Sequence, residues 1–250
     1  MKKIIFVLAM LFSCHSYAVE LLNPYKGGSI AVELYSNLEN HLKSNGIQVN
    51  VVNLDNCRLI SSVWKNYKNP LYISWSDSAK ECNVEATHIN ILLKSTHLFC
   101  TNKPLSSLKD NIKIGWQPAG RPLEAVYNAF ESKYGKTIKV PYVNGGQQVQ
   151  GVVSGEIDVA LLGQGTALTS NLNCFLSVSP FNDLPVLDHS FGELYDSLTG
   201  IMYENPNLAP IIIEFINLPQ TKLWKERRKF QDVNNSNERD LFLKNAFRPK

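Results

Sequence analysis

The sequence predicts an α/β fold made of two similar halves, and three observations carry this prediction. Segments with an apolar residue at about every fourth position, as on one face of a helix, alternate with short apolar runs typical of strands. Glycine-rich or polar turns follow several of these strands, which is where open parallel sheets bind their ligands. The chain of 250 residues is long enough for one large domain or two small ones. We therefore expect two halves that face each other and enclose a cleft.

The first half begins with a short strand at residues 19–22, a glycine-rich turn at 23–29 and a helix. Asn45-Gly46 ends this helix, because glycine readily takes the left-handed conformation that closes a helix. Residues 47–52 then alternate between apolar and polar as a strand does. The apolar face of the helix is Ile30, Leu34, Leu38 and Leu42, and later strands are expected at residues 70–75 and 88–100.

The second half repeats the order of strand, turn and helix. A strand at residues 113–116 turns through residues 117–121 into a helix that starts at Pro122, since proline suits the first helical position. Gly135 closes that helix. The elements expected after it are a strand at 138–142, a turn at 144–146, a helix at 147–154 with Val149, Val152 and Val153 inward, and a buried strand at 157–162.

Residues 1–18 have the shape of a secretory signal peptide. Two lysines precede an apolar run at residues 4–12 that is too short to cross a bilayer, and the pattern fits cleavage after Ala18. We therefore expect an exported protein. The alternative is a lipoprotein box at residues 11–14, which would lipidate Cys14 and tether the protein to a membrane.

Loss of the signal peptide removes two lysines and lowers the formal net charge from +3 to +1. The basic run that remains, at residues 225–229, is interpreted as the solvated side of a helix, with an anionic membrane surface or a docking partner as the alternative. Nucleic acid is not an expected partner of so weakly charged a chain.

Four cysteines remain after the signal peptide, an even number that suits a compartment permitting disulfides. Their wide spacing does not resemble a zinc site, and the histidines are not paired at metal-ligand spacing, so neither a metal nor a cofactor is expected. The sequence allows three disulfide pairings, with free buried thiols as the alternative. The four cysteines are Cys57, Cys82, Cys100 and Cys174.

Four predicted strand ends carry small, polar or glycine-rich residues, at 25–29, 74–78, 117–121 and 163–166. Ligands of parallel sheets lie beyond such ends. The first end is the most informative, because a glycine-rich turn before a helix points free backbone N–H groups at one spot and favours an anion. Together with export, this turn predicts the capture of a small acid.

Three motifs stand in a fixed order along the chain: Pro-x-x-Gly-Gly-Ser at residues 24–29, a segment at 98–109, and Val-Pro-Tyr-Val-Asn-Gly-Gly-Gln-Gln at 140–148 followed by residues 153–159. Their order and spacing resemble those of the Bug or TctC family, the periplasmic receptors of tripartite tricarboxylate transporters. The resemblance implies a periplasmic location and a two-domain, type II periplasmic-binding-protein fold, with the ligand cleft between domains joined by a hinge.

The same resemblance implies how the chain divides. The first domain would comprise residues 19–99 plus 175–250, and the second domain residues 100–174. The chain would thus cross between the domains near Cys100 and return near Cys174.

These crossings also imply a disulfide pairing. Cys100 with Cys174 would clamp the hinge, and Cys57 with Cys82 would lie within the first domain.

Backbone N–H groups of two loops typically hold the ligand carboxylate in this family, so the resemblance implies such roles for residues 27–29 and 119–121. Lys26 and Arg121 depart from the small or uncharged residues expected there; either would favour a second acidic group on the ligand, unless it points to solvent. The predicted ligand-binding residues are Tyr25, Lys26, Gly27, Gly28, Ser29, Ser74, Trp75, Ser76, Gln117, Ala119, Gly120, Arg121, Gln164 and Thr166.

The expected partners of a monomeric receptor are a small carboxylate and the membrane subunits of a transporter. The resemblance weakens after residue 185, where the chain turns Asn-rich and charged, so presentation of the ligand to a sensor kinase, or scavenging without transport, is the alternative. A further hypothesis is a secreted hydrolase that uses Ser29 and Asp77. We expect no enzyme, because the sequence lacks a nucleophile elbow and a zinc-protease motif.

Overall fold

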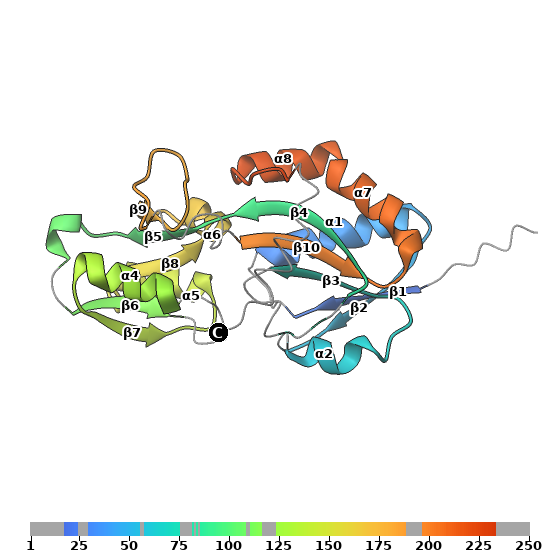
Figure 1. Cartoon of the computed structure of the whole chain (residues 1–250), viewed down its shortest axis with the longest axis horizontal. Helices are drawn as coiled ribbons and strands as arrows, with labels where there is room; N and C mark the ends of the chain where they lie inside the picture. The colour runs from blue at the N-terminus through green and yellow to red at the C-terminus, as the bar shows by residue number, and fades with distance from the viewer. Residues whose placement is uncertain are drawn as a thin grey trace, which may run out of the picture.

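The computed structural model describes residues 18–24, 30–55, 58–75, 82, 84, 86–108, 111–116, 124–188 and 197–233. These residues form two five-stranded mixed sheets, each with its own helices, which lie side by side as two lobes (Figure 1). None of the described helices is long and apolar enough to span a bilayer.

The first lobe contains the first sheet, in the strand order β2-β1-β3-β10-β4. β1 pairs in parallel with β2 and β3, whereas β10 runs antiparallel to both β3 and β4. Its elements are β1 (Ala18–Asn23), α1 (Ile30–Ser44), β2 (Gln48–Asn53), α2 (Arg58–Trp64), β3 (Pro70–Trp75), β4 (His88–Ser95), β10 (Ser197–Tyr203), the 3₁₀ segment η3 (Pro206–Leu208), α7 (Ala209–Asn217) and α8 (Pro219–Arg227).

Helix α1 is fixed to the first sheet by both its apolar face and one hydroxyl. Leu34, Leu38 and Leu42 are fully or almost fully buried, as their spacing predicts. The Tyr35 hydroxyl donates to the Leu22 carbonyl at 2.9 Å and accepts from the Ile73 N–H at 3.0 Å. Because β1 and β3 are neighbours in the sheet, this one side chain ties both strands to the helix.

The second lobe contains the second sheet, in the order β7-β6-β8-β5-β9, with β6 parallel to β7 and β8 and with β5 antiparallel to β8 and β9. Phe99 of β5 stacks on Phe130 of α4 on one face, while its neighbour Leu98 packs with Val152 of α5 on the other. The elements are β5 (His97–Thr101), the 3₁₀ segment η1 (Leu105–Ser107), β6 (Ile112–Trp116), α4 (Glu124–Tyr134), β7 (Thr137–Pro141), α5 (Gly145–Ser154), β8 (Val159–Gly163), α6 (Gln164–Thr169) and β9 (Asn173–Ser177).

One of the two connections between the sheets is a single residue. β4 ends at Ser95 and β5 begins at His97, so Thr96 alone separates a strand of the first sheet from a strand of the second (Figure 1). The chain changes sheet again between β9 and β10. The predicted domain boundaries after residues 99 and 174 fall inside β5 and β9, and we propose a division at these two sheet changes instead.

A disulfide joins Cys100 and Cys174, as the resemblance implied. The two residues face each other in register on β5 and β9, which are neighbours within the second sheet. The bond therefore does not clamp the hinge, contrary to expectation, because neither strand belongs to the first sheet.

Cys82 is also disulfide-bonded, so free thiols are excluded for the described cysteines. Its predicted partner, Cys57, and the lipidation candidate, Cys14, lie outside the described residues.

The second sheet is held at one end by Asp158, which directly precedes β8. Its carboxylate pairs with Lys103 Nζ and accepts from the Lys113 N–H at 2.9 Å. Burial alone would raise the pKa of Asp158, but the hydrogen bonds and charges of these two lysines outweigh it and lower the pKa.

We expect Asp158→Asn to destabilise the protein at neutral pH and to have little effect in acid. A carboxyl whose pKa is lowered by folding adds stability above its unfolded pKa, near 3.8, and loses it as the pH falls through the lower folded value. Urea unfolding at neutral and acidic pH, with the exposed Asp183→Asn as control, measures this. An equal loss at both pH values would contradict it.

Candidate functional site

Parallel strands of the two sheets end facing each other. β1 and β3 run toward the second lobe, and β8 runs toward the first, so their carboxyl ends meet at the junction of the lobes (Figure 1). This is where the sequence predicts a ligand. Ten predicted ligand-binding residues lie outside the described part of the chain: Tyr25, Lys26, Gly27, Gly28, Ser29, Ser76, Gln117, Ala119, Gly120 and Arg121.

Ser74 and Trp75 end β3 in the first lobe. Ser74 is buried and its hydroxyl donates to the Trp75 carbonyl at 3.3 Å, while the Trp75 side chain is half-buried. Thr199 of β10 stands opposite Trp75 in the sheet and is fully buried. Its hydroxyl has no hydrogen-bond partner among the described residues. Sequence analysis did not single out Thr199, because a single threonine in an apolar strand has no distinctive pattern.

Gln164, the first residue of α6, lies at the junction itself and is only 2% exposed. Its Oε1 accepts from the Thr96 N–H at 3.2 Å, and its Nε2 donates to the carbonyls of Arg228 and Lys229 at 2.8 and 2.6 Å. One side chain thus holds together the second lobe, the single connecting residue and the end of α8. These bonds occupy the amide in the structure, and a ligand contact by Gln164 stays a prediction.

The segment after α8 also joins the first sheet. Gln231 exchanges two backbone hydrogen bonds with Lys94, both of 3.1 Å, and Arg228 pairs with Glu33 of α1 at 2.5 Å. We call residues 228–231 the hinge strap. Through Gln164 and Lys94 it contacts both lobes on either side of Thr96.

A small cavity of about 10 Å³ lies beside the strap, roughly enough for one water molecule. It is too small for a dicarboxylate. Its lining residues are Lys94, Ser95, Thr96, Gln164, Ser179, Pro180 and Gln231.

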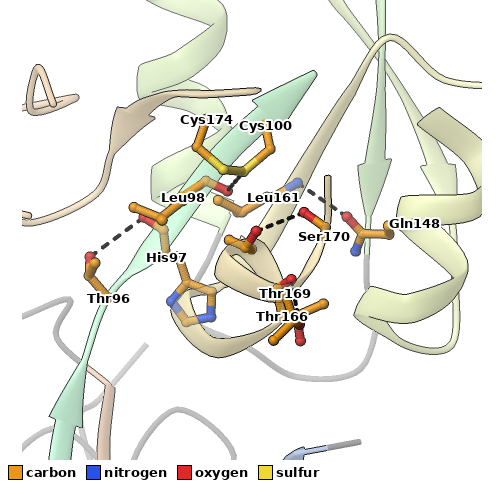
Figure 2. The surroundings of a disulfide bond; sticks show 11 residues. Thr96, His97, Leu98, Cys100, Gln148, Leu161, Thr166, Thr169, Ser170 and Cys174 are labelled. Atoms are coloured by element: carbon orange, nitrogen blue, oxygen red, sulfur yellow. Dashed lines mark hydrogen bonds between the residues drawn. A yellow bond between two sulfur atoms is a disulfide. The ribbon is translucent and has the colours of Figure 1, made fainter. Parts of the chain in front are cut away.

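Gln148 of α5 reaches the carboxyl end of the second sheet. The β6–β8 ladder ends at the pair Gly115–Ala160, and the next N–H of β8, that of Leu161, donates to Gln148 Oε1 at 3.1 Å (Figure 2). The side chain is fully buried, and its Nε2 has no hydrogen-bond partner among the described residues. Sequence analysis placed Gln148 inside a motif but did not single it out, since a glutamine beside a second glutamine resembles a solvated helix face.

Trp116 and Thr166 flank this region. Trp116 ends β6 and is half-buried, with Lys139 Nζ 5.6 Å from its ring centroid. Thr166 is half-buried in α6, and its methyl group lies 3.4 Å from the position that a Cβ on Gly145 would take. A ligand contact by Thr166 stays a prediction.

The described residues do not include a group of three or more His, Cys, Asp or Glu placed to hold a metal ion. Two histidines are engaged within the first lobe: His41 Nε2 lies 3.1 Å from the Ile211 carbonyl, and His88 stacks on Tyr203 at 5.4 Å. The described part of the junction contains the unpaired polar groups of Thr199 and Gln148 and the half-buried Trp75 and Trp116.

No family model and no curated protein matches the sequence. Solved structures do match in fold. MatC from Rhodopseudomonas palustris with bound malate has a TM-score of 0.69 at 13% identity, covering 92% of this chain and 96% of that one. Rpa4515 of R. palustris with adipate has a TM-score of 0.69 at 11% identity, covering 92% and 97%.

The periplasmic binding protein BugD is a third, with a TM-score of 0.68 at 11% identity and coverage of 92% of this chain and 94% of that one. At such identities the likeness shows the fold alone. The predicted resemblance to the Bug and TctC proteins is confirmed at that level, and so is the predicted fold: a two-lobed α/β periplasmic-binding-protein fold.

Proposed function

We propose that this protein is an exported solute-binding protein that captures a small carboxylate between its two lobes. The observation that carries the proposal is the meeting of parallel strand ends from both sheets at a junction crossed through Thr96. The fold is shared with proteins solved with malate and with adipate. Both ligands are dicarboxylic acids, which can be held at two ends.

The ligand carboxylate would be held by N–H groups of residues 25–29 and 119–121. Each loop joins a parallel strand to a helix, β1 to α1 and β6 to α4. A helix N-terminus carries partial positive charge, and its first N–H groups lack partners within the helix, so a carboxylate accepts charge-assisted hydrogen bonds there. An acid bound to both loops would draw the lobes together.

Calorimetric titration of the ligand-free mature protein with succinate, malate, adipate, amino acids and aromatic acids tests this function. A bound acid at a hundred times its dissociation constant also stabilises the fold by roughly 2.7 kcal/mol, so a thermal-shift scan gives a second readout. Binding of one acid class supports the proposal. Failure of a folded protein to bind any of them would refute it.

Gly28→Val should abolish binding of whichever acid the wild type takes up. The reason is that a branched side chain prevents the close approach of the backbone to the carboxylate. Titration calorimetry measures the affinity, and a melting temperature near that of the wild type shows that the variant is folded. Unchanged affinity would remove this loop from the site.

The proposed destination of the ligand is a tripartite tricarboxylate-type transporter in the membrane of the same cell, with the receptor in the periplasm. Cells lacking the receptor should fail to take up the radiolabelled acid, and the wild-type chain should restore uptake. The receptor could bind the acid in vitro while cells that lack it still take up the acid normally. That result would favour ligand presentation to a sensor, or scavenging.

A further inference from the structure

Gln148 presents two N–H donors that the described fold leaves without a partner. Glutamine side chains are rarely buried, and a buried donor without an acceptor costs folding free energy that an apolar residue of the same shape would not. Gln148 is nevertheless 0% exposed, and its Nε2 lacks a hydrogen-bond partner among the described residues. The side chain therefore requires a reason beyond packing.

The orientation of the amide follows from its neighbour. The backbone nitrogen of Leu161 can only donate, so the atom 3.1 Å from it must be the oxygen of Gln148. The amide nitrogen is consequently the atom directed away from β8 (Figure 2). A flipped amide would set two donors against each other.

Gly115 of β6 leaves the space that the Gln148 amide occupies. A Cβ on Gly115 would lie 2.7 Å from Gln148 Oε1, closer than Cβ atoms approach other heavy atoms in real proteins, so glycine at this position permits the approach. Gly115 and Leu161 lie where the β6–β8 ladder ends and both strands reach their carboxyl ends. Gln148 is thus fixed between the two strands of the second lobe that lead to the junction.

We propose that Gln148 Nε2 is a ligand-binding donor of the second lobe, which takes an oxygen of the bound acid. A primary amide nitrogen donates and does not accept, so its partner is a carboxylate, carbonyl or hydroxyl oxygen. Donation to a carboxylate is charge-assisted and about twice as strong as a neutral hydrogen bond. The inference rests on the proposed function. It adds a residue that favours ligands with an oxygen atom at the end facing the second lobe.

Two variants test the donor, and one controls for the substitution. Gln148→Met keeps the side-chain length but removes the amide. Gln148→Glu keeps an acceptor for the Leu161 N–H and puts a second oxygen where the donor was. The control is Gln150→Met, which makes the same change on the exposed side of the same helix. Titration calorimetry with malate, succinate and adipate gives the affinities, and thermal unfolding shows which variants are folded.

We expect each folded Gln148 variant to bind the acid at least about tenfold more weakly than the wild type, which corresponds to roughly 1.4 kcal/mol. The Gln150→Met control should stay within about twofold, since surface changes away from the site have small effects. A folded Gln148 variant with wild-type affinity would overturn the role of Gln148 and leave the proposed function standing. Failure of the wild type to bind any acid of the full panel, with amino acids and aromatic acids included, would overturn both.

Discussion

The double variant Cys100→Ala/Cys174→Ala is expected to unfold roughly 8–16 °C below the wild type. The disulfide joins residues 74 positions apart in the sequence, and closing a loop of that length removes chain entropy from the unfolded state. The chain-entropy model gives about 4 kcal/mol for such a loop. In a chain of this size, each kcal/mol moves the melting temperature by about 2–4 °C.

Thermal unfolding under oxidising conditions measures this effect. Reduced wild-type protein is a poor substitute for the variant, because the reductant also opens the disulfide of Cys82. Neither cysteine is among the predicted or proposed ligand contacts, and the bond joins β5 to β9 without crossing between the lobes, so the affinity for the ligand below the transition should be retained. A melting temperature equal to that of the wild type would show that the bond adds no stability.

Gln164→Leu is expected to cost about 3 kcal/mol or more and to alter ligand affinity. The substitution removes three hydrogen bonds at once, and each backbone group left without a partner costs about 1–3 kcal/mol. Two of these groups belong to the hinge strap and the third to Thr96. Loss of these bonds detaches the strap from the second lobe and leaves Thr96, which connects β4 to β5, held by its bonds to Ser179 and to the Gln164 backbone.

Urea unfolding and titration calorimetry on the same preparation separate the two effects. Gln150→Leu, an exposed position on α5, is the matched control and should change neither quantity. Gln164→Glu is a second variant, which keeps the acceptor for Thr96 but loses the two donated bonds. If Gln164→Leu matched the wild type in both measurements, the strap would have no part in holding the hinge.

Local patterns were sufficient to predict the elements whose cause is local. The leucines of α1 recur every four residues and are buried, and Gly46 ends that helix with a φ of +74°. The glycine-rich positions after β1 and β8 likewise indicated the ends where the sheets meet. Periodicity and turn chemistry act between neighbours in the sequence, so they can be recognised without the fold.

The prediction was wrong where a face of α5 had to be chosen. Val149, Val152 and Val153 were expected inward, but Val153 is 61% exposed and Val152 is fully buried. Successive residues of a helix point about 100° apart around its axis. Two adjacent valines therefore cannot both face the core when only a narrow side of the helix is buried. Gln148 takes part of the buried face instead. A hydropathy pattern does not reveal such a residue, because glutamine is polar and it is buried here with its amide hydrogen-bonded to β8.

Other features depend on contacts between distant parts of the chain. β10 lies between β3 and β4, although both precede it by more than a hundred residues, and sequence analysis made no prediction for this strand. The roles of Thr199 and Gln164 follow from this insertion and from the return of α8 to the junction. No local pattern encodes which strand will stand beside which.

The strand-end tryptophans give the molecule an optical reporter. Trp75 and Trp116 each end a strand, one in each lobe, and both are half-buried, whereas Trp64 and Trp224 are buried. Indole emission depends on contact with water, so an acid that brings the lobes together would alter the emission of the first pair while the second supplies a steady background. Stopped-flow fluorescence could then time the closing of the lobes with no label attached, and Phe substitutions at Trp75 and Trp116 would apportion the signal between the lobes.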